Sequence, residues 1–117
     1  MKQILAVGVG GMIGSLLRAW VYALVPGGFG LWAVNLVGSF FIGVAAARLN
    51  RKPAELRLLV STGLLGAFTT FSAFSNDWFH YLDASIFLGM AFALSMTLGC
   101  IAAAAGGLWV GRRGESV

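Results

Sequence analysis

Four long apolar stretches, separated by short polar segments, make up almost the whole of this sequence. The hydrocarbon core of a bilayer is about 30 Å thick, and an α-helix needs about 20 apolar residues to cross it. Each stretch is close to that length or longer, and each ends near a turn or near charged residues. We therefore predict an all-α membrane protein with a single transmembrane domain, residues 1–117, whose four helices span approximately residues 4–24, 31–48, 56–76 and 84–110.

The composition supports a membrane location. Only 10% of the residues are charged and 59% are hydrophobic, with a mean hydropathy of +0.89, whereas soluble domains carry about 25% charged residues. All four tryptophans lie near predicted span ends, as in the aromatic belts of membrane interfaces. The net charge of +4 comes from too few residues to form a nucleic-acid-binding patch. The lipid bilayer is therefore the predicted surroundings, and no nucleic acid is expected as a partner.

The basic residues predict the orientation. With four spans, both termini and the loop between the second and third spans share one side of the membrane. Seven of the eight Lys and Arg residues lie on that side, the opposite loops contain none, and Arg18 lies within the first span. Because Lys and Arg concentrate in cytoplasmic loops, we predict a multi-pass protein of the cell membrane with both termini in the cytoplasm.

Two other classes of membrane protein share this general outline. A small multidrug-type proton-coupled transporter also has four spans, but it needs an acidic residue within the membrane, and none lies within a predicted span. A structural subunit of a membrane complex would use small-residue pairs such as Gly10 and Gly14 for helix packing. No combination of nucleophile and base suggests an enzyme.

The third span contains a stretch that disfavours a continuous helix. Glycines, two adjacent threonines and several serines fall between residues 63 and 75, and these residue types weaken helices. We predict a break in the middle of the membrane, which is tolerated only where backbone is buried in protein or lines a wet cavity. Carbonyl groups freed by such a break can bind a small cation. Phe71 and Phe74 would share a helical face, and their positively polarised ring edges can face an anion.

Three motifs together resemble the Fluc family of fluoride channels, also called CrcB proteins. The third span carries the run Gly63-x-x-Gly66-x-x-Thr69-Thr70-Phe71-Ser72-x-Phe74-Ser75. The first two spans carry Gly10-Gly11-x-x-Gly14-Ser15-x-x-Arg18 and Asn35-Leu36-x-Gly38. The resemblance covers essentially the whole chain. It implies a fluoride-specific ion channel that lowers cytoplasmic fluoride by passive efflux, because fluoride that enters as HF is trapped as the anion.

The same resemblance implies an antiparallel dimer with two pores and a structural sodium ion at its centre. Backbone carbonyl groups of Gly66 and Thr69 would bind the sodium. The residues implied along the pore are Asn35, Phe71, Phe74, Thr70, Ser72, Ser95 and Arg18. Ala91 stands where many members have a pore tyrosine, so one hydroxyl group on the ion path is missing or comes from another subunit.

The charge bias adds an expectation about the partner subunit. An antiparallel homodimer requires one sequence to insert in both orientations, whereas seven cationic residues against none should fix a single orientation. We therefore expect a heterodimer with a separately encoded homologous subunit of opposite bias. A homodimer stays an alternative, because packing can override a charge bias.

Overall fold

The computed structural model describes residues 1–115, with side chains through Arg113, so the last two residues of the predicted domain lie outside it. The elements are α1 (Lys2–Leu24), α2 (Phe29–Arg48), α3 (Ala54–Arg57), the π-helical segment η1 (Leu58–Leu65), α4 (Gly66–Phe68), α5 (Phe71–Ala84) and α6 (Ile86–Glu115). Within these described residues, four helical segments are long and apolar enough to cross a membrane, and α3 to α5 together form the third. This confirms the predicted all-α membrane fold.

The four spans pair through glycines that bring backbones into contact. Gly10 and Gly14 of α1 lie against η1, where an added Cβ atom would collide with the carbonyl oxygens of Leu59 and Leu64. Gly107 of α6 faces the carbonyl of Phe40 on α2 in the same way. Small residues allow such close approach between membrane helices. The result is two close pairs, α1 with the third span and α2 with α6.

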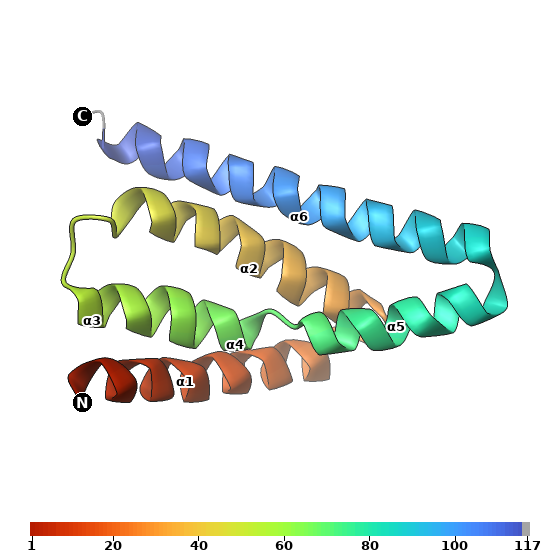
Figure 1. Ribbon diagram of the computed structural model, residues 1–117, viewed down its shortest axis with the longest axis horizontal. Helices are drawn as coiled ribbons and strands as arrows, with labels where there is room; N and C mark the ends of the chain where they lie inside the picture. Colours follow the sequence, from red (N-terminus) through yellow and green to blue (C-terminus); the bar gives the residue numbers. More distant parts are fainter. Residues whose placement is uncertain (116–117) are drawn as a thin grey trace.

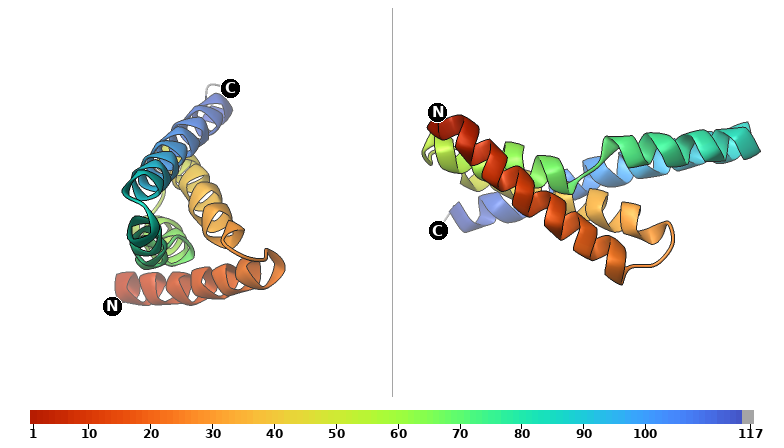
Figure 2. Two further views of the ribbon diagram at one scale, coloured as in Figure 1. Left: turned by 90° about the vertical axis from the view of Figure 1, so that its right-hand side faces the viewer. Right: turned by 90° about the horizontal axis from the view of Figure 1, so that it is seen from below.

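The pairs form an open arrangement rather than a closed bundle. In Figure 1, α6, α2, the third span and α1 follow one another from top to bottom, and α5 and α6 form a hairpin at the far end. Figure 2 shows α1 crossing the other spans obliquely. Gly27, which has a positive φ of 66°, forms the tight turn between α1 and α2, a conformation that favours glycine.

The last part of the third span differs from the sequence expectation. The sequence predicts that this span ends near residue 76 and that the next begins near residue 84, but α5 continues to Ala84. Aromatic packing accounts for the extension, because Tyr81 packs against Phe92 of α6 with ring centroids 4.7 Å apart. The chain then reverses at Ser85, whose backbone is extended.

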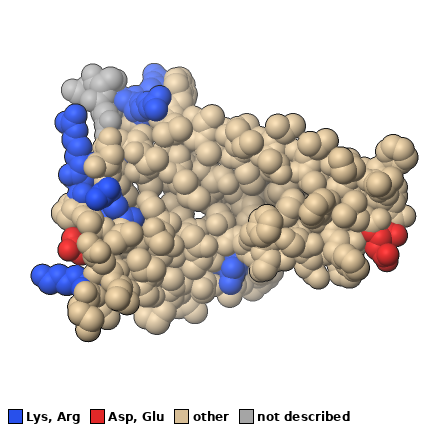
Figure 3. All heavy atoms as spheres, in the orientation of Figure 1, with Lys and Arg blue, Asp and Glu red and all other residues tan. Residues whose placement is uncertain are grey.

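Most of the charged side chains lie at the two ends of the molecule. Figure 3 shows most Lys and Arg side chains gathered at the end that carries both chain termini. This is the distribution that the sequence predicts for a single orientation in the membrane.

Candidate ion site

The third span breaks where the sequence predicts. Helix α4 stops after Phe68, and both threonines that follow are extended, with ψ of 158° at Thr69 and φ and ψ of −144° and 118° at Thr70. Helix α5 begins again at Phe71. Thr70 caps this new helix, because its Oγ1 accepts a hydrogen bond from the backbone N–H of Ala73 at 3.2 Å, as N-cap threonines do.

Asn35 of α2 holds the broken backbone. The backbone N–H of Thr70 donates to Oδ1 of Asn35 at 2.9 Å, and Nδ2 of Asn35 donates to the carbonyl oxygen of Thr70 at 3.2 Å. Asn35 is 7% exposed and Thr70 is 8% exposed. A buried peptide group must find a partner, and this amide satisfies both the donor and the acceptor that the break leaves open.

The same contacts free two carbonyl groups. In a continuous α-helix, the N–H of Thr70 would donate to the carbonyl of Gly66, and that of Ala73 would donate to the carbonyl of Thr69. Here the first N–H is taken by Asn35 and the second by the Thr70 hydroxyl. The two carbonyls that lose these helical donors are those of Gly66 and Thr69, the residues that the family resemblance implies as sodium ligands.

A groove of about 330 Å³ lies beside the break and is bounded by α2, α5 and α6. Four of the predicted pore residues, Asn35, Thr70, Phe71 and Phe74, line it together with Thr69. The other described residues that line the groove are Ser39, Ile42, Met96, Thr97, Cys100 and Ile101. None of these carries an acidic or basic side chain.

The remaining predicted pore residues lie outside this lining. Ser72 is exposed, and its hydroxyl is 3.2 Å from Oγ1 of Thr70, so it borders the break. Ser95 and Ala91 are exposed on other faces of α6, and Arg18 lies on α1. The groove thus brings together residues of the second and third spans, and on α6 it is lined by Met96, Thr97, Cys100 and Ile101.

The two predicted pore phenylalanines differ in how firmly they are held. Phe74 stacks on Phe92 of α6 with ring centroids 5.3 Å apart, and on Trp78 at 6.2 Å. Phe71 contacts the Phe74 ring at 5.8 Å but is 77% exposed. One ring is therefore fixed by its own chain, while the other presents most of its surface outward.

Several residues at this site are not among the pore residues predicted from the sequence. Ser39 and Thr97 bring hydroxyl groups to the groove, and Phe92 supports Phe74 from behind. Gly38 lets α2 touch the break, because an added Cβ atom would collide with Cγ2 of Thr69. Gly38 belongs to a recognised motif, but no sequence signal identifies the face of α6 that carries Thr97.

The fold and the groove define a multi-pass membrane protein with an uncharged polar site at a broken helix. Comparison with known proteins agrees with the resemblance seen in the sequence. Residues 5–108 match the family model described as CrcB-like protein, Camphor Resistance (CrcB). The chain belongs to this family.

Relatives in the family carry a consistent name. The chain is 42% identical over 122 residues to the "Fluoride-specific ion channel FluC" of Allorhizobium ampelinum, covering 96% of this chain and 98% of the relative. It is 54% identical over 86 residues to the protein of the same name from Rhizobium etli, covering 66% and 69%. The protein of that name from Methanocaldococcus jannaschii is 36% identical over 107 residues, covering 86% of each chain.

Proposed function

We propose that this chain is the subunit of a fluoride-specific channel that lowers cytoplasmic fluoride by passive efflux. The observation that carries the proposal is the buried Asn35–Thr70 pair beside Phe71 and Phe74, in a family whose relatives are named as fluoride channels. For an anion, the site provides hydrogen-bond donors and aromatic ring edges but no fixed charge. An ion held without a fixed counter-charge is bound weakly enough to leave, which conduction requires.

Asn35 has two roles in this proposal. One hydrogen of its Nδ2 is used by the Thr70 carbonyl, and a side-chain amide has two such hydrogens. The second is available to a fluoride ion in the groove. Anchoring the first hydrogen fixes the direction of the second, so the donor is held in position before the ion arrives.

Phe71 and Phe74 replace water around the ion. Their ring edges carry partial positive charge, and Phe74 is kept in one orientation by Phe92 and Trp78. The hydroxyl groups of Thr70, Ser72 and Thr97 supply further donors along the path. Ser95 and Arg18 lie outside the groove of this subunit. We propose that they line the pore on a face that a second subunit completes.

The carbonyls of Gly66 and Thr69 are the proposed ligands of a structural sodium ion. Their helical donors are diverted, and hard cations such as sodium bind well to carbonyl oxygens. When bound, the ion would supply positive charge at the break of the third span. Asn35 occupies the N–H of Thr70 and the Thr70 hydroxyl occupies the N–H of Ala73, so neither N–H donates to these carbonyls.

An antiparallel dimer is the assembly that we propose. Gly66, Phe71, Ser72 and Thr97 are all exposed near the break in this chain. Hydroxyl groups and free carbonyls facing hydrocarbon are unfavourable, so a second subunit that covers this face would stabilise it. We propose that the partner is a homologous subunit of opposite charge bias, and that the termini of this chain are cytoplasmic.

Deleting the gene for this chain from cells with no other fluoride exporter tests the proposal. Cytoplasmic fluoride should rise, and growth should stop at a lower external fluoride concentration, with tolerance of chloride unchanged. Restoring the gene should reverse both effects. Fluoride tolerance that is the same with and without the gene would contradict the proposed function.

A further inference from the structure

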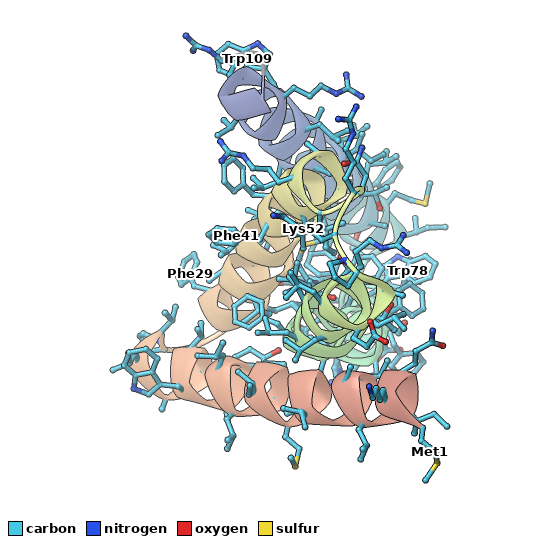
Figure 4. The ribbon with its side chains drawn as sticks, turned by 90° about the vertical axis from the view of Figure 1, so that its left-hand side faces the viewer. Met1, Phe29, Phe41, Lys52, Trp78 and Trp109 are labelled. Atoms are coloured by element: carbon cyan, nitrogen blue, oxygen red, sulfur yellow. The ribbon has the colours of Figure 1, made fainter. Side chains whose placement is uncertain are left out.

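A second groove lies on the face of the molecule away from the ion site. It has a volume of about 440 Å³ and is bounded by α1, α2, η1 and α4. Among the described residues that line it, Arg48 alone is polar, and the others include Leu17, Val37, Phe41 and Leu64. Figure 4 shows Phe41 on the opposite side of the end-on view from Trp78, whose ring stacks on the pore residue Phe74. This groove therefore opens away from the candidate pore.

The position of Arg48 along α2 sets the depth of the groove in a membrane. Helix α2 has 20 residues, from Phe29 to Arg48, which corresponds to a length of about 30 Å, the thickness of the hydrocarbon core. With Phe29 at one interface, Arg48 reaches the headgroup layer at the other. The apolar lining then extends from that layer into the hydrocarbon, as far as Val37, about 16 Å along the helix.

The guanidinium of Arg48 is held at the mouth of the groove. Its Nε donates to the carbonyl oxygen of Gly111 on α6 at 3.2 Å. A guanidinium has five N–H donors, so this contact leaves the terminal nitrogens to bind an anion. Arginine binds phosphate through two parallel hydrogen bonds. The other cationic residues at this end of the molecule make the surrounding potential positive as well.

We propose that this groove binds one anionic phospholipid, with the phosphate on Arg48 and an acyl chain between α1 and α2. The groove is lined by α1 and α2 as well as by η1 and α4, and all of its described lining except Arg48 is apolar, which suits an acyl chain. The lipid would link α1 to the α2–α6 pair, which otherwise meet mainly through the third span. This site is separate from the ion path, so it does not depend on the proposed channel function.

Lipid-dependent thermal stability of the purified assembled protein in a neutral detergent tests the site. Phosphatidylglycerol should raise the melting temperature more than phosphatidylcholine with the same acyl chains, and native mass spectrometry should detect retained phosphatidylglycerol. Inorganic phosphate alone should give no shift. Equal shifts with both lipids, or a shift with phosphate alone, would contradict a site for a whole anionic lipid.

Variants separate the site from general surface charge. Arg48→Gln should weaken phosphatidylglycerol binding by about tenfold, since charge-assisted hydrogen bonds are lost, whereas Arg51→Gln in the adjacent loop removes the same charge outside the groove and should have little effect. The lipid-dependent shift is compared within each variant, so any loss of basal stability from the Gly111 contact does not affect the result. Equal weakening by both variants would overturn the proposal.

A groove-filling variant tests the acyl chain. Val37 is 45% exposed and lines the groove, and Leu16 is 71% exposed on α1 outside the lining. Val37→Trp should reduce lipid retention, while Leu16→Trp should preserve it. Unchanged retention in Val37→Trp would exclude the groove as the binding site. If Val37→Trp instead dissociates the assembly, the groove is an interface between chains and the lipid proposal is wrong.

Discussion

The side chain of Asn35 and the backbone of Thr70 form two hydrogen bonds with each other, at 2.9 and 3.2 Å, across 35 positions of sequence. This pairing replaces the helical hydrogen bond that the third span loses at its break. It also leaves one hydrogen of Asn35 free beside the two phenylalanines. The structural and the proposed ion-binding roles of Asn35 are therefore connected.

Replacing Asn35 tests that connection. Asn35→Asp keeps an acceptor for the Thr70 N–H but places an oxygen opposite the Thr70 carbonyl, at a buried position. We expect a loss of about 1–3 kcal/mol in stability, measured as a lower melting temperature, together with loss of fluoride flux. The control Asn50→Asp, which changes an exposed residue, should alter neither. A wild-type melting temperature in Asn35→Asp would show that the pairing does not hold the break.

The two pore phenylalanines should respond differently to the same substitution. Phe74→Ile removes the stacking on Phe92 and Trp78 and should lower both flux and stability, the latter by about 0.5–1.5 kcal/mol. Phe71→Ile changes a side chain that its own subunit leaves exposed. It should lower flux about tenfold, equivalent to about 1.4 kcal/mol in the barrier, with little change in the stability of the isolated chain.

Phe87 on α6 is the matched control for these variants, because it is 83% exposed and lies outside the groove. Phe87→Ile should conduct like the unmodified protein. If Phe71→Ile and Phe74→Ile also conduct normally, the ion path does not pass the two rings.

Sodium removal tests the proposed cation site. If carbonyls of Gly66 and Thr69 bind sodium, exchange of sodium for a large organic cation should lower flux and weaken the assembly. Thr69→Ser keeps the backbone carbonyl and the hydroxyl that donates to Leu65 at 3.1 Å, so its effect should be mild. Full flux and unchanged melting temperature after exhaustive dialysis against a sodium-free buffer would rule the site out.

The hydropathy of the chain was sufficient to predict its four spans, and the residues around Thr69 and Thr70 were sufficient to predict the break. Both are local properties of the sequence. The end of the third span was not predictable in this way, because α5 continues where Trp78 stacks on Phe74 of the same helix and Tyr81 packs against Phe92 of α6. The Asn35–Thr70 pair depends on how two distant segments dock, and a single sequence carries no signal for that.

The face of α6 that lines the groove also could not be predicted from the sequence. Ser95 and Thr97 are two residues apart, which places them on nearly opposite sides of a helix. Helix α6 is apolar on all sides through the membrane, so no polar stripe indicates its rotation. The resemblance favoured Ser95, whereas the structure has Thr97 in the groove lining.

The orientation of the chain decides between the two proposed dimers. Seven Lys and Arg residues against none predict one orientation with the C-terminus in the cytoplasm. A cysteine added at the C-terminus, with Cys100 replaced by alanine, should react in intact cells only with a membrane-permeant reagent. Equal labelling by an impermeant reagent would mean insertion in both orientations, and would favour the homodimer.

The central claim is that fluoride passes through this protein selectively. The most direct measurement is ion release from liposomes that contain only the purified assembly, followed with fluoride-selective and chloride-selective electrodes under the same gradient. We predict rapid fluoride release, no chloride release above that of protein-free liposomes, and fluoride release that is about tenfold slower in Phe71→Ile. Release of both ions at similar rates, or no fluoride release from a correctly assembled sample, would contradict the account.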